Sequence, residues 1–219
     1  MDGKERIAVI GGSGALGGAL ALRLARAGYP VTIGSRDRAK AEAAAAALGA
    51  AVPHAAVGAG DNRAAAAAGA IVLLAVPYAA ERATLAEIAG LLDGKILIDA
   101  TAPLVPPQVA RVQLPEGGST VAAMQAMLGA GVRVVSAFQN VAAQKLAADA
   151  PVACDVLVCA DDRAARERVI ALAAEIGVTA IDAGPICNSA AAEALTAVLI
   201  AINRRYKVPG AGIRIVGLD

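Results

Sequence analysis

The chain has 219 residues, a formal net charge of +1 and a hydrophobic content of 58%. This length is enough for one large domain, or for a nucleotide-binding domain with a small addition. The near-neutral charge gives no support for a nucleic-acid or membrane-surface partner, and three Tyr, one Phe and no Trp provide no aromatic platform for bases. The sequence has no run of about twenty strongly apolar residues and no recognisable signal peptide, so we expect a cytoplasmic protein with no membrane partner.

The first predicted element is a strand over residues 7–10 that ends in a glycine-rich turn. Its short β-branched sequence is typical of a strand buried on both faces of a parallel sheet. Gly12, Gly14 and Gly17 follow with the spacing G-x-G-x-x-G, which predicts a tight turn, a close approach of backbone to a pyrophosphate and close packing of the next helix. That helix is capped at Gly28 and would present its unpaired N–H groups to the phosphates. The alternative is a purely structural turn.

The second predicted strand, residues 31–33, ends where NAD and NADP sites differ. An NAD site usually has Asp or Glu there to bind the ribose 2′-hydroxyl. This chain has Ser35, which can hydrogen-bond a 2′-phosphate, and Arg36, which can pair with that phosphate and stack on adenine. We therefore predict NADP(H) as the cofactor. The alternative is a solvated, charged helix start over residues 36–42.

Strands and helices then alternate to the end of the chain. We expect helices over residues 39–48, 63–68, 78–92, 121–128, 163–176 and 190–206, and strands over 71–76, 95–99, 132–136, 156–159 and 179–181. Residues 50–62 are predicted to be irregular, and residues 213–216 to be an edge strand or an interface segment. The alternation predicts an α/β fold with a Rossmann-type doubly wound parallel sheet. We expect residues 1–140 to form an NADP-binding domain and residues 141–219 a small α/β domain that completes the substrate pocket.

Few side chains are available for metal chemistry. His54 is the only histidine, and Cys154, Cys159 and Cys187 lack C-x-x-C spacing. These residue types and spacings exclude the usual zinc sets, so we predict no metal site and three buried, reduced thiols.

Ligands of a doubly wound sheet lie beyond the carboxyl ends of its strands. Residues 76–78, 99–104 and 138–141 are therefore candidate walls for the nicotinamide end. An NADP-dependent carbonyl or imine reductase would also need a proton donor, for which Lys145 or Tyr78 is the candidate. For Lys145 the alternative is an exposed helix charge.

Six segments of the chain resemble one known family: GGSGALG, GSRDRAKA, LLAVPY, VVSAF, DVLVCADD and DAGPICN. In this order they are similar to the F420H2:NADP oxidoreductases, the NADPH-dependent reductases of coenzyme F420. The resemblance runs from Ile7 to about Ile215. It implies a dinucleotide domain, a small C-terminal domain and hydride transfer between a nicotinamide and a deazaflavin ring, without a catalytic side chain.

The resemblance also implies which residues bind each ligand. Ser35, Arg36 and Lys40 would hold the 2′-phosphate. The other residues implied for the cofactor lie in the glycine turn and after the third and fifth predicted strands: Gly12, Ser13, Gly14, Ala15, Leu16, Gly17, Val76, Pro77, Ala137, Phe138 and Asn140. The residues implied for the partner ring are Gln139, Pro185, Ile186 and Asn188.

Two segments depart from the family pattern. Residues 138–140 are Phe-Gln-Asn where many relatives carry His, and residues 190–192 are all Ala where the last helix usually begins with Arg. Both lie on the side of the hydride partner. The alternatives to coenzyme F420 or a similar flat carrier are therefore a small carbonyl or imine substrate, or a non-catalytic NADP(H)-sensing module. We also expect a homodimer, because the apolar residues 208–218 need covering.

Overall fold

The computed structural model describes residues 4–218. Its main sheet has six parallel strands in the order β3-β2-β1-β4-β5-β6. The strands are β1 (Ile7–Ile10), β2 (Val31–Gly34), β3 (Val57–Gly60), β4 (Ile71–Leu74), β5 (Ile96–Asp99) and β6 (Arg133–Ser136). The order reverses between β1 and β4, as in a Rossmann-type doubly wound sheet, so the predicted fold class is confirmed.

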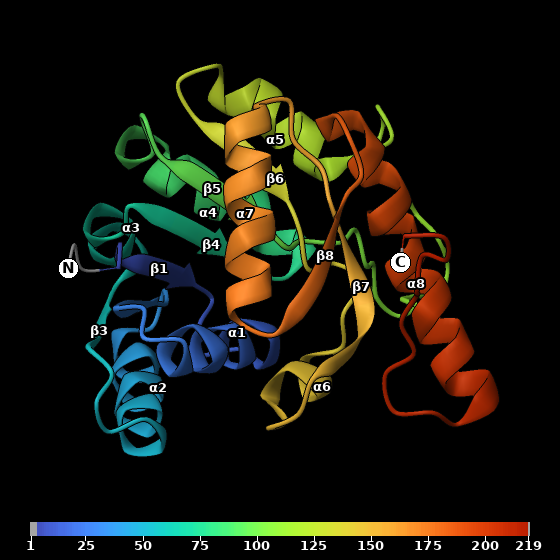
Figure 1. The fold of residues 1–219 in the computed structure, drawn as a ribbon. Coiled ribbons are helices and arrows are strands. Elements are labelled where there is room, and N and C mark those ends of the chain that lie inside the picture. Colours follow the sequence, from blue (N-terminus) through green and yellow to red (C-terminus); the bar gives the residue numbers. More distant parts are fainter. Residues whose placement is uncertain (1–3, 219) are drawn as a thin grey trace.

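Helices cover both faces of this sheet (Figure 1). They are α1 (Ala15–Arg26), α2 (Arg38–Ala51), α3 (Asn62–Ala68), α4 (Tyr78–Ile88), the 3-10 helix η1 (Ala89–Leu91) and α5 (Thr120–Leu128). Strand side chains alternate between two core clusters: Ile7 and Val9 of β1 pack with α1 and α2, whereas Ala8 and Ile10 pack with α3, α4 and α5. Both faces of β1 are therefore buried, as its β-branched sequence predicts.

The second part of the chain forms a smaller sheet. Its elements are α6 (Ala143–Ala147), β7 (Val152–Val158), α7 (Arg163–Glu175), β8 (Val178–Asp182), the 3-10 helix η2 (Ile186–Asn188) and α8 (Ser189–Tyr206). Strands β7 and β8 pair in parallel, and an antiparallel bridge between Ser136 and Cys159 connects this pair to β6. In Figure 1, α8 stands on the side of the molecule opposite β3.

The buried side chain of Arg23 holds α1 to this second part. Its guanidinium donates hydrogen bonds of 2.6–3.3 Å to the carbonyl oxygens of Lys145, Leu146, Ala148, Ala150 and Ile176. Next to it, Arg26 forms a more exposed ion pair with Asp149 at 3.2 Å. These contacts dock α6 and the end of α7 on one face of α1.

Several expected boundaries are wrong. Residues 57–60, predicted to be irregular, form β3, an edge strand whose sequence Val-Gly-Ala-Gly carries little apolar signal. Strand β4 ends at Leu74 instead of Val76, and β7 begins at Val152 instead of Val156. The helix α6 was not expected. Of the segment predicted as an edge strand, Ile213 makes an isolated bridge to Asp155.

Two further expectations need correction. Cys154 and Cys159 are buried as predicted, but Cys187 is exposed. In addition, the segment Ile186–Tyr206 is long and apolar enough, by length and composition alone, to cross a membrane. This is weak evidence for a membrane span because core helices pass the same test. Its buried Glu193 accepts hydrogen bonds from α5, as a helix packed against protein would.

Candidate functional site

The glycine turn between β1 and α1 depends on a residue that the spacing argument did not select. Gly11 has a φ of +81°, and a Cβ atom there would lie 2.4 Å from the carbonyl oxygen of Ala75. The left-handed residue of the turn is therefore Gly11, while Gly12 is crowded as well: a Cβ atom there would lie 2.9 Å from Ile33 Cδ1 and 3.0 Å from the carbonyl oxygen of Val9. A Cβ atom on Gly17 would lie 2.4 Å from the carbonyl oxygen of Gly11, so Gly17 does let α1 pack on the turn.

A cavity of about 150 Å³ lies beside this turn. The adjacent carboxyl ends of β1, β2 and β4 form it, together with the first turns of α3 and α4. The lining residues are Gly11, Ser13, Gly14, Ser35, Arg36, Asn62, Ala75, Val76, Pro77, Ala80 and Thr84. The structure thus brings together the predicted residues Ser13, Gly14, Ser35, Arg36, Val76 and Pro77.

The donors around this cavity suit a dinucleotide with a 2′-phosphate. Gly14 caps α1 without a side-chain hydrogen bond, and the N–H groups of Ala15, Leu16 and Gly17 have no acceptor within the helix. Gly14 is exposed, and an added Cβ atom would meet only the carbonyl oxygen of Gly11, at 3.2 Å. An anion can therefore approach the positive end of the helix dipole.

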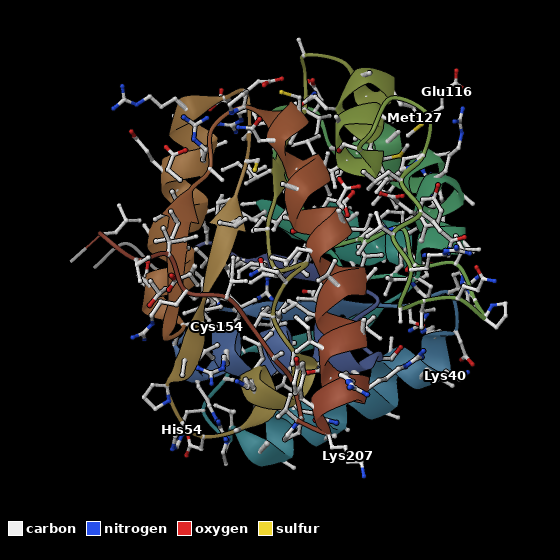
Figure 2. The ribbon with its side chains drawn as sticks, turned by 90° about the vertical axis from the view of Figure 1, so that its right-hand side faces the viewer. Lys40, His54, Glu116, Met127, Cys154 and Lys207 are labelled. Carbon is white, nitrogen blue, oxygen red and sulfur yellow. The ribbon has the colours of Figure 1, made fainter. Side chains whose placement is uncertain are left out.

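Of the two basic residues predicted to bind the 2′-phosphate, Arg36 lines the cavity and Lys40 lies on α2. Arg36 takes part in none of the salt bridges of residues 4–218, so its guanidinium is available to a phosphate. Lys40 lies outside the cavity lining, 3.8 Å from Asp37, whose side chain caps α2. Figure 2 shows Lys40 at the surface of the molecule. The alternative of a solvated charged helix start thus describes Lys40, whereas Arg36 is exposed but lines the cavity.

The predicted residues after β6 do not line this cavity. Ala137 and Phe138 are buried in the core, and Phe138 has a φ of +71° that turns its ring into the cluster packed on α1 and α7. The Gln139 amide donates to the carbonyl oxygen of Asp99, at 2.8 Å, and the Asn140 amide to that of Asp155, at 2.7 Å. Gln139 and Asn140 instead line a second cavity of about 200 Å³ beside α8.

The residues predicted for the partner ring lie in and next to η2. Ile186 packs in the core cluster beside α5, while Pro185 and Asn188 are exposed. The Asn188 amide donates to the carbonyl oxygen of Ala183 at 2.7 Å. None of these residues lines either cavity.

The two candidate proton donors have different surroundings. Tyr78 is the first residue of α4 and directly follows the cavity residue Pro77. Lys145 lies in α6, where its carbonyl oxygen accepts a bond from Arg23. Its side chain does not line the cavity. The geometry therefore gives no support to Lys145 as a donor there.

Asn62 is a cavity residue that the sequence analysis missed. It is buried at the start of α3, where its amide donates to Glu87 at 3.1 Å. The preceding Asp61 caps this helix by accepting from the N–H group of Ala64 at 2.7 Å. The Asp-Asn pair ahead of an alanine run is a recognisable helix start, but the unrecognised strand β3 hid its position at the edge of the sheet.

The sequence comparisons agree with the geometry. The family model described as NADP oxidoreductase, coenzyme F420-dependent, matches residues 6–103. The F420-dependent NADP reductase of Methanothermobacter thermautotrophicus is 42% identical to this chain over 231 residues, which cover 97% of this chain and 95% of the relative. The reductase of the same name from Methanocaldococcus jannaschii is 40% identical over 223 residues, covering 98% and 99%.

Solved structures of more distantly related proteins share this fold. A hypothetical protein of Sinorhizobium meliloti has a TM-score of 0.67 and 24% identity, covering 98% of this chain and 94% of its own. An imine reductase of Myxococcus stipitatus has a TM-score of 0.61 and 21% identity, covering 93% and 62%. These two likenesses show the fold alone. The identity to the archaeal reductases over nearly the whole chain shows more: the chain belongs to the F420-dependent NADP reductase family.

Proposed function

We propose that this protein transfers a hydride between NADP(H) and coenzyme F420. The observation that carries the proposal is the cavity at which Ser35 and Arg36 meet the uncapped start of α1. A hydroxyl, an unpaired guanidinium and a helix N-terminus form a donor set for a 2′-phosphate, which NAD lacks, and for the pyrophosphate. The archaeal relatives are named for the same pair of cofactors.

Each part of the site has a separate task in this reaction. Ser35 and Arg36 bind the 2′-phosphate, with Lys40 adding positive charge nearby, and the first turn of α1 binds the pyrophosphate. Val76 and Pro77 border the nicotinamide, which supplies the hydride chemistry when it is bound. The protein's own contribution is to hold two rings at contact distance and to exclude water.

The partner ring is proposed to lie between the two parts of the chain. Residues 1–140 would form the NADP-binding part, and residues 141–219 would complete the pocket for the partner ring. The main chain of residues 137–140 and the η2 segment, residues 185–188, would border the deazaflavin. The side chains of Phe138 and Ile186 would act from behind this surface, because both are buried in the core.

The proposal is tested by mixing purified protein with NADPH and oxidised coenzyme F420. The absorbance of the oxidised deazaflavin is expected to fall in proportion to the NADPH consumed. If the folded protein instead reduces small carbonyls or imines and leaves coenzyme F420 unchanged, the assignment of the partner is wrong. Binding of NADPH without turnover of any acceptor would indicate a sensing module.

Gly14→Val is expected to weaken NADPH binding by about tenfold or more, equivalent to about 1.4 kcal/mol. The two added methyl groups would project where the pyrophosphate approaches the backbone. Because Gly14 has an ordinary φ of −87°, the variant should keep its fold. The matched control is Gly49→Val in α2, where an added Cβ atom meets nothing within 4 Å. Titration of both variants with NADPH measures the effect; equal affinities would remove the glycine turn from the site.

A homodimer and a cytoplasmic location are also proposed. Large apolar side chains are exposed on α8 and on the segment after it: Val198, Tyr206, Val208, Ile215, Val216 and Leu218. A two-fold partner would cover them. Light scattering during size-exclusion chromatography should give twice the chain mass, and the mass of a single chain would contradict the dimer.

A further inference from the structure

Four buried polar side chains meet between α4, β5, α5 and α8. Glu81, Asp99, Thr120 and Glu193 are each at most 3% exposed. The Thr120 hydroxyl donates a hydrogen bond to Glu81, and the Thr120 N–H donates to Glu193 at 2.8 Å. Three carboxyl groups therefore share one desolvated cluster at the carboxyl end of the main sheet.

Glu193 is well supplied with donors in this cluster. Its carboxylate accepts from the Ser119 hydroxyl at 2.7 Å and from the N–H groups of Thr120 and Val121 at the start of α5. Burial raises the pKa of Glu193, and these bonds act against that rise. The helix N-terminus thus stabilises a negative charge on Glu193.

Glu81 and Asp99 have fewer hydrogen-bond donors than Glu193 does. Glu81 Oε1 and Asp99 Oδ2 are buried and accept from no N–H or O–H donor in the described part of the chain. Each carboxyl group lies close enough to the other to shift the pKa of its neighbour. A hydrogen bond between the two groups would give both buried oxygens a partner, and it would need a proton because two ionised carboxylates can only accept hydrogen bonds.

We propose that Glu81 and Asp99 share one proton, and that this pair positions the first turn of α4 against the end of β5 beside the cofactor cavity. Ala80 and Thr84 of α4 flank Glu81 in the helix and line the cavity. On the other side, the main chain of Asp99 accepts a bond from Gln139 and its Oδ1 accepts from the Thr101 N–H. The pair therefore joins the cavity wall to the loops after β5 and β6.

The surrounding charges favour the shared proton. Besides each other, Glu81 and Asp99 face the ionisable group of Glu193, so all three ionisable groups of the cluster are acidic. Burial, followed by the negative charge of Asp99, raises the pKa of Glu81 to about 9. Burial also raises the pKa of Asp99, opposed by the bond from Thr101. Loss of the proton would place two like charges in contact between α4 and β5.

Infrared spectroscopy at neutral pH tests the shared proton directly. The wild-type protein is expected to show the carbonyl stretch of a protonated carboxyl group, and Glu81→Gln and Asp99→Asn should each lose it. In either variant the new amide can donate to the remaining carboxylate, which replaces the proton and preserves the fold. Glu116→Gln, at an exposed position labelled in Figure 2, should keep the band. Absence of the band from wild type, or its presence in both pair variants, overturns the proposal.

The pH dependence of thermal unfolding gives a second test. The pKa of Glu81 is higher in the folded protein than in the unfolded chain. At pH values between these two pKa values, the folded protein keeps a proton that the unfolded chain has released. Stability contributed by the pair should therefore fall as pH rises from about 4.5 to about 9, with no further loss above that range. Glu81→Gln should reduce this downward slope of the melting temperature. An unchanged slope would contradict the shared proton.

The positioning role rests on the proposed function and has its own readout. The NADPH dissociation constant of wild type should rise as pH approaches 9, whereas that of Glu81→Gln should rise less. The same rise in both proteins would overturn the positioning role. If neither protein binds NADPH but the infrared band behaves as expected, the proposed function fails and the shared proton stands.

Discussion

Arg36→Ala is expected to weaken NADPH binding by about ten- to a hundredfold and to weaken NADH binding far less. The two cofactors differ by the 2′-phosphate, and losing a hydrogen bond to a charged group costs about 1.5–3 kcal/mol. Arg36 lines the cavity and has no ion-pair partner among residues 4–218, so no internal ion pair is lost with it. Titrations of wild type and variant with both cofactors measure the difference.

Arg38→Ala is the matched control for this prediction. Arg38 lies two residues further along, outside the cavity lining, and pairs with Glu42 at 2.8 Å. Its loss should change both affinities little, because the Arg38–Glu42 pair lies on the surface of α2 away from the cavity. If Arg36→Ala weakened NADPH and NADH equally, Arg36 would not bind the 2′-phosphate.

Arg23→Met is expected to lower the free energy of unfolding by about 3 kcal/mol or more. Methionine retains most of the apolar stem but leaves the carbonyl oxygens of residues 145, 146, 148, 150 and 176 without the donor that now satisfies them. Each buried polar group left unpaired costs about 1–3 kcal/mol, and local movement can recover part of the total. Urea unfolding followed by circular dichroism measures the change.

The control for Arg23 is its neighbour on the same helix. Arg26→Ala removes the exposed pair with Asp149 and should cost at most about 1 kcal/mol. A loss from Arg23→Met that is no larger than the loss from Arg26→Ala would show that the guanidinium does not hold the two parts together.

The elements predicted correctly are those whose local sequence determines their environment. Residues 7–10 and 71–74 are short β-branched or leucine runs, which fit only a strand buried on both faces. The sequence analysis missed strand β3 because two of its four residues are glycines, which have no apolar side chain to signal a strand. Glycine instead lets the backbone pack closely on β2: a Cβ atom on Gly58 would lie 3.4 Å from the Thr32 hydroxyl. Its pairing with β2, not its own composition, makes it a strand.

In the candidate site, too, some features follow from the local sequence and others depend on the folded structure. Ser35 and Arg36 follow directly from the end of β2, because parallel strands place their carboxyl ends at one edge of the sheet. The direction of the Phe138 ring depends on a left-handed backbone conformation that non-glycine residues rarely adopt. The proposed pair of Glu81 and Asp99 joins residues far apart in sequence, on α4 and β5. No local pattern predicts either feature.

The central claim is a direct hydride transfer between NADPH and coenzyme F420. It is tested most directly with NADPH that carries deuterium at both C4 positions of the nicotinamide, mixed with oxidised coenzyme F420 and this protein. We predict that the deuterium is recovered on the deazaflavin ring carbon of the reduced coenzyme, one label for each NADPH consumed. Recovery of the deuterium in water, or no reduction of coenzyme F420 by protein that binds NADPH, would contradict the claim.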